Sequence, residues 1–82
     1  MTLSAESRAL AAAAESLEAL RAAMEKETVD GNVKAAIEDY KKLAQSANKS
    51  VAARSLVRLG ECYEKQGNAE ARKTYEQVLS RF

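Results

Sequence analysis

The 82-residue sequence contains no histidine, proline or tryptophan, and it has a single cysteine. Without histidine the chain lacks the usual general base near neutral pH and the commonest nitrogen ligand for metals. Cys62 has no second cysteine with which to form a disulfide, so folding does not depend on an oxidising compartment. We therefore expect a protein that is not an enzyme and that holds no cofactor and no metal.

Long apolar runs and an excess of charge of one sign are also missing. No stretch approaches the ~20 apolar residues of a membrane-spanning helix, and no signal peptide opens the sequence. The formal net charge is +1, which gives no basic surface for nucleic acid. We expect no nucleic-acid partner, no membrane insertion and, by default, a cytoplasmic location. An excerpt from a longer exported or envelope protein would share these features.

Helix-forming residues dominate what is present, and glycine occurs only at positions 31, 60 and 67. This composition predicts a single all-α domain. Breaks are expected at Asp30-Gly31-Asn32, at residues 46–50 and at Gly67-Asn68. They separate four helices: one over about 5–27 after a Ser4 cap, one after an Asn32 cap, one over about 51–66 and one over about 69–81.

Residues 53–82 carry the most informative pattern. The first part follows the signature W-x2-L-G-x2-Y at Leu56, Leu59, Gly60 and Tyr63, with Leu in place of Trp. The second part follows A-x3-F at Ala71 and Tyr75, with Tyr in place of Phe. This stretch resembles the tetratricopeptide repeat (TPR) family. The resemblance implies two antiparallel helices that pack with Gly60 against Ala71, while the second helix buries Ala71, Tyr75, Val78 and Leu79.

Residues 17–52 resemble a first, degenerate repeat. Gly31 and Gly67 lie 36 residues apart and Tyr40 and Tyr75 lie 35 apart, close to the TPR period. Glu27 occupies the place of the signature tyrosine, so we expect a hole or an exposed edge there. The resemblance implies antiparallel helical hairpins stacked as a right-handed α-α superhelix, with residues 1–16 as an N-terminal helical extension.

The same resemblance implies a binding surface. In TPR proteins the first helix of each repeat lines a concave groove that holds a peptide or helix of a partner protein. The matching positions here are Arg21, Glu25, Arg54, Val57, Arg58 and Glu61. Arg54 and Arg58 stand where some TPR domains grip a terminal carboxylate, or alternatively they form ion pairs with Glu61, Glu18 or Glu25. Because the asparagines of such clamps are missing, we favour a groove of mixed charge for a helix or an acidic segment.

A second function from another class is self-association, most simply as a homodimer of a larger, envelope-associated bacterial protein. Two repeats are few for a continuous core. Apolar side chains also stand at both ends of the chain, at Leu3, Leu10 and Leu17 and at Val78, Leu79 and Phe82. The heptad spacing of the three leucines suits either a short coiled coil or a helix packed on its own domain.

Overall fold

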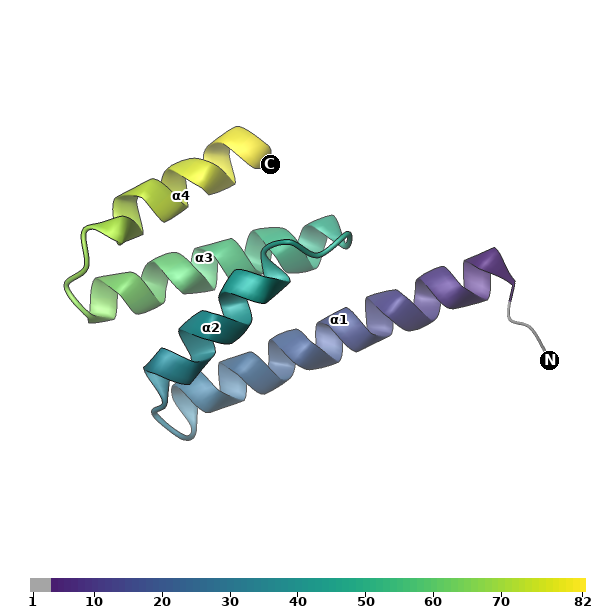
Figure 1. The fold of residues 1–82 in the computed structure, drawn as a ribbon, viewed down its shortest axis with the longest axis horizontal. Coiled ribbons are helices and arrows are strands. Elements are labelled where there is room, and N and C mark those ends of the chain that lie inside the picture. The colour runs from purple at the N-terminus through teal and green to yellow at the C-terminus, as the bar shows by residue number, and fades with distance from the viewer. Residues whose placement is uncertain (1–3) are drawn as a thin grey trace.

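The structure, a computed structural model, describes residues 4–82. Over this range the chain forms four helices and no strand: α1 (Ala5–Thr28), α2 (Val33–Leu43), α3 (Lys49–Lys65) and α4 (Glu70–Arg81). Figure 1 shows two antiparallel hairpins, α1–α2 and α3–α4, with α1 reaching well beyond α2 at its N-terminal end. The predicted all-α class and helical hairpins are confirmed. No helix in the described range is long and apolar enough to cross a membrane.

The helix boundaries follow from the capping residues. Ser4, Asn32 and Asn48 each accept a hydrogen bond from a backbone N–H in the first turn of the helix that follows. The Asn68 side chain accepts from the N–H of Glu70 at the start of α4, at 2.9 Å. Asn48 caps α3, since its side chain accepts from the N–H groups of Ser50 and Val51. The turns between helices are therefore specified locally.

Both hairpin turns contain a glycine with positive φ, Gly31 at 65° and Gly67 at 64°. This left-handed conformation ends the preceding helix and costs glycine little, because it has no Cβ. The two glycines therefore place the two turns that the sequence predicted.

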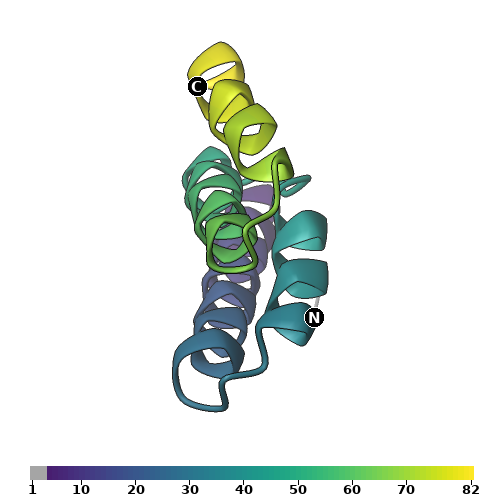
Figure 2. The same cartoon turned by 90° about the vertical axis from the view of Figure 1, so that its left-hand side faces the viewer.

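The core lies where α2 packs against both α1 and α3, and Figure 2 shows this end-on, with α1 and α3 on one side and α2 beside them. Each fully buried large apolar side chain contributes about 1.5–3 kcal/mol, so this cluster is the main source of stability. Tyr40 of α2 and Val51 of α3 are its largest fully buried apolar members. The cluster comprises Leu20, Ala23, Ala36, Ile37, Tyr40, Ala44, Val51, Leu56, Leu59 and Cys62.

The contact at Gly60 differs from the one predicted. A Cβ placed at Gly60 would lie 2.5 Å from Cε1 of Tyr75, and its three nearest atoms all belong to that ring. The group nearest to Gly60 is therefore the Tyr75 ring rather than the predicted Ala71. Tyr75 lies one turn further along α4, and its long side chain fills the space over the glycine. Ala71 is itself buried.

Two predictions about the end of α4 were also wrong. Val78, which was expected on the buried side of α4 but was also counted among the uncovered apolar side chains at the end of the chain, packs against the core, so the second of these expectations was wrong. Leu79, which was expected on the buried side of α4, is 84% exposed. Consecutive residues of a helix point about 100° apart, so α4 buries one of this pair and exposes the other.

Candidate functional site

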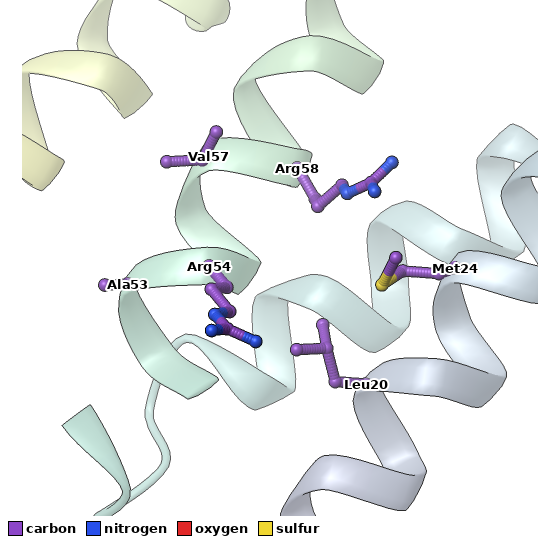
Figure 3. A pocket seen from close by; sticks show the side chains of 6 residues that line it. All are labelled: Leu20, Met24, Ala53, Arg54, Val57 and Arg58. Carbon is purple, nitrogen blue, oxygen red and sulfur yellow. The ribbon is translucent and has the colours of Figure 1, made fainter. Parts of the chain in front are cut away.

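A groove runs between α1 and α3, the first helices of the two hairpins. Its larger part is a hollow of about 390 Å³. Figure 3 shows Arg54 and Arg58 of α3 reaching toward Leu20 and Met24 of α1, while Ala53 and Val57 lie on the opposite side of α3 in this view. The residues that line the hollow are Leu20, Met24, Ala53, Arg54, Val57 and Arg58.

A second hollow of about 240 Å³ continues this surface toward the N-terminal end of α1. It is lined by Leu17, Leu20, Arg21, Met24 and Arg54, three of which also line the first hollow. The two hollows are therefore parts of one surface, which we call the α1–α3 groove. Its floor is apolar, and its charged side chains are all arginines.

The structure brings together four of the six predicted groove residues. Arg54, Val57 and Arg58 line the larger hollow, and Arg21 lines the smaller one. Glu25 and Glu61 line neither hollow. The lining of the groove is consequently basic rather than of mixed charge.

The three arginines differ in how far their charge is already compensated. Arg21 lies 3.9 Å from Glu18 in a highly exposed pair, which contributes little. The Arg58 guanidinium lies 4.0 Å from the buried carboxylate of Glu27. Arg54 has no carboxylate of residues 4–82 within ion-pair distance, so it is the most available cation in the groove.

Glu27 forms the polar centre of the fold rather than a hole or an exposed edge, so that prediction was wrong. Its side chain is 2% exposed. The Tyr40 hydroxyl donates to Oε1 at 2.7 Å, and the Lys65 ammonium donates to Oε2 at 2.5 Å. The carboxylate thus takes the volume of the missing tyrosine and links α1 to both α2 and α3.

The charge of Glu27 is maintained by its donors. Burial alone would raise the pKa of this carboxyl, but the hydrogen bonds from Lys65 and Tyr40 outweigh burial and hold the pKa below its ordinary value of 4.5. The same contact raises the pKa of Lys65. Both groups are therefore ionised at neutral pH, and Arg58 lies beside a fixed negative charge.

Cys62 is buried in the core, as predicted. Burial, together with the nearby Glu27 carboxylate, raises the pKa of its thiol to about 11. The thiol is therefore protonated at neutral pH and is a poor nucleophile. Residues 4–82 also contain no group of three or more acidic or cysteine side chains placed to hold a metal ion.

The residues predicted for self-association lie in different surroundings. Leu10 and Leu17 on α1 are 73% and 46% exposed, and Leu79 and Phe82 at the other end are exposed as well. The Arg81 guanidinium stacks 5.2 Å from the Phe82 ring centre while it donates to the carbonyl of Ala44. Leu3 lies outside the described residues.

Two features near the groove were not predicted from the sequence: the apolar side chains of its floor and the buried contact between Glu27 and Lys65. Leu20, Met24 and Ala53 were not predicted to line the groove, and Lys65 was not singled out. One signal was available for Glu27: it lies seven residues after Leu20 and four residues after Ala23, on the same face of α1. A carboxylate at such a position predicts a buried ionic contact.

Residues 54–82 match the family model of the tetratricopeptide repeat. The matched segment contains most of α3 and all of α4, the hairpin that carries the Gly60–Tyr75 contact. Comparison with curated proteins and with solved structures found no match.

Proposed function

Because residues 54–82 match the family model of the tetratricopeptide repeat, we propose that the chain is a non-catalytic protein-interaction module that binds its partner in the α1–α3 groove. Repeats of this kind generally serve as interaction modules. The groove supports this function because it is an apolar hollow lined by both hairpins. A ligand bound there contacts Leu20 and Met24 of one hairpin and Val57 of the other.

The partner's chemistry follows from the lining. An aliphatic side chain seated between Leu20, Met24 and Val57 loses contact with water, and this burial supplies affinity. Arg54 and Arg58 supply positive charge at the rim and attract carboxylates. We therefore propose a peptide or helix with an apolar anchor flanked by acidic residues. Arg54 is the main contact for the acidic flank, because Arg58 already faces Glu27.

This function is tested with a pair of labelled helical peptides. One is alanine-based with two leucines one turn apart and flanking glutamates, and its twin has lysines in place of the glutamates. Fluorescence anisotropy is measured at protein concentrations where sedimentation shows a monomer. The acidic peptide is expected to bind more tightly than the basic one, and its affinity should fall as salt is added, because exposed charges are screened.

Arg54→Glu is the decisive variant, since it reverses the charge at the rim without touching the core. It is expected to weaken binding of the acidic peptide by about tenfold or more. Arg72→Glu makes the same charge change on α4, outside the groove, and is expected to bind as the unmodified chain does. Equal binding by Arg54→Glu, or equal binding of the basic twin, would contradict the proposal.

Self-association is a second proposed function, favoured by one observation. Leu10, two turns before Leu17, is 73% exposed on a part of α1 that no other helix covers. Burying such a side chain contributes about 1.5–3 kcal/mol. A second copy of the chain is a partner that is always present, and two-fold pairing leaves no open end.

A further inference from the structure

We propose that the exposed N-terminal part of α1 of one copy occupies the α1–α3 groove of a second copy, so that self-association and partner binding exclude each other. This inference rests on the proposed function of the groove. It adds that the chain carries its own competitor for that site.

The first argument is continuity of the surface. Leu17 lies in the groove itself, as part of the second hollow. Leu10 lies seven residues earlier and Met24 seven residues later, so all three are on nearly the same face of α1. The apolar stripe of the extension therefore runs into the groove. If a second copy lies antiparallel along this stripe, the N-terminal part of its α1 covers the larger hollow of the first copy.

The second argument is complementarity of charge. All charged residues that line the groove are arginines. On the extension, Glu6 precedes Leu10 by one helical turn and lies on the same stripe. An acidic residue followed by apolar anchors is the ligand that the groove chemistry selects. In the antiparallel arrangement Glu6 points toward the end of the groove that contains Arg58.

The third argument is the shape of the extension. Residues 11–14 are four consecutive alanines, of which Ala11, Ala12 and Ala14 are exposed. Small side chains let a second helix approach closely and fit between the larger Leu20 and Met24 on the other copy. From Ala5 to Leu17 the helix spans about 18 Å at ~1.5 Å per residue, enough to cover both hollows.

The test compares three single substitutions by sedimentation at tens of micromolar protein. Leu10→Lys changes the extension but not the groove, and Val57→Glu changes the groove but not the extension. We expect the unmodified chain to be a dimer and both variants to be monomers. Leu79→Glu adds a charge at an apolar residue on α4 that is more exposed than Leu10 or Val57, and it is expected to remain a dimer.

Val57→Glu distinguishes groove occupation from a simple pairing of leucines, which would leave α3 untouched. A dimer that survives Val57→Glu, or one that Leu79→Glu splits, overturns the inference, as does a monomeric unmodified chain. Circular dichroism on each variant separates loss of the dimer from loss of the fold. If Val57→Glu is unfolded, Arg54→Glu replaces it, with loss of the dimer as the expected result.

Competition is tested with a labelled peptide that copies residues 4–20. It is expected to bind the Leu10→Lys variant, whose groove is open, and not the double variant Leu10→Lys/Val57→Glu. At ten times the dimer Kd about one fifth of the chains are monomeric, so the unmodified chain should bind this peptide about fivefold more weakly than Leu10→Lys. Equal affinity of the two overturns the exclusion.

The two proposals fail in different ways. If the acidic alanine-based peptide binds the groove but Val57→Glu leaves the dimer intact, the proposed function stands and the self-occupation falls. If Val57→Glu splits the dimer but the acidic peptide does not bind a monomeric variant, the groove serves the second copy alone.

Discussion

At Gly60 the absence of a side chain leaves room for the ring of Tyr75 to lie across α3. A methyl group there would meet ring atoms at 2.5–2.9 Å. Gly60→Ala is therefore expected to destabilise the fold by about 1–3 kcal/mol through overpacking and to stabilise it by about 1 kcal/mol through helix propensity. We expect a net decrease in the free energy of unfolding, measured by urea denaturation.

The partner of Gly60 is identified by repeating the substitution without the ring. In a Tyr75→Ala background the clash is gone, so Gly60→Ala is expected to be neutral or to stabilise the protein by up to ~1 kcal/mol. The same loss of stability in both backgrounds would show that another group limits the space over Gly60.

Between elements, the hydrogen bonds of Glu27 are the polar link that joins α1 to α2 and α3. Glu27→Gln keeps the shape of the side chain but removes its charge. Because hydrogen bonds to charged groups contribute more than neutral ones, we expect the free energy of unfolding at pH 7 to fall by about 1 kcal/mol. Glu25→Gln, on the exposed side of the same helix, is the matched control and is expected to change little.

The effect of Glu27 depends on pH in a defined direction. Its folded-state pKa is below the ordinary value of 4.5, so the carboxylate stabilises the fold at pH values above 4.5. That stabilisation is lost as the pH falls through the folded-state pKa. The difference between the unmodified chain and Glu27→Gln should therefore vanish in acid. A difference that persists there would assign the effect to packing.

Most of the element arrangement could be predicted, because the signals are local. Ser4, Asn32 and Asn48 fix helix starts, and Gly31 and Gly67 fix turns, whatever the rest of the chain does. The contacts of Glu27 and Gly60 could not be predicted in the same way. They depend on which side chain of a neighbouring helix reaches the position, and periodicity within one helix does not contain that information.

For the candidate site, the sequence identified the helices but not the balance of charge. Of the predicted positions, Arg54, Val57 and Arg58 of α3 and Arg21 of α1 line the two hollows. Glu25 and Glu61 have the expected spacing but line neither hollow. Spacing within one helix does not determine how its outward side chains are placed against the neighbouring helices.

As a whole the molecule is elongated, with a Cα radius of gyration of 13.9 Å and extents of 50 × 31 × 13 Å. A compact chain of this length has a radius of gyration of about 12 Å. The uncovered N-terminal part of α1, where residues 4–12 are exposed, contributes to this elongation. Its contribution to the stability of the monomer should therefore be small.

Deleting residues 1–11 tests this division of the molecule. We expect the free energy of unfolding to fall by less than about 1 kcal/mol, the cost of losing the Ser4 cap. The measurement is made by urea denaturation at concentrations where both chains are monomeric, because association would add apparent stability. A chain that unfolds without these residues would contradict a separate extension.

The ion pair between Glu27 and Lys65 also bears on the order of folding. Its partners lie 38 residues apart in the sequence, whereas each hairpin closes over a turn of a few residues. Helical hairpins form from local contacts and are fast, and a distant pair must wait until the hairpins meet. Loss of this contact is thus expected to speed unfolding more than it slows folding. In the intact chain, the ion pair of Glu27 with Lys65 therefore stabilises the contact between two hairpins that have already formed.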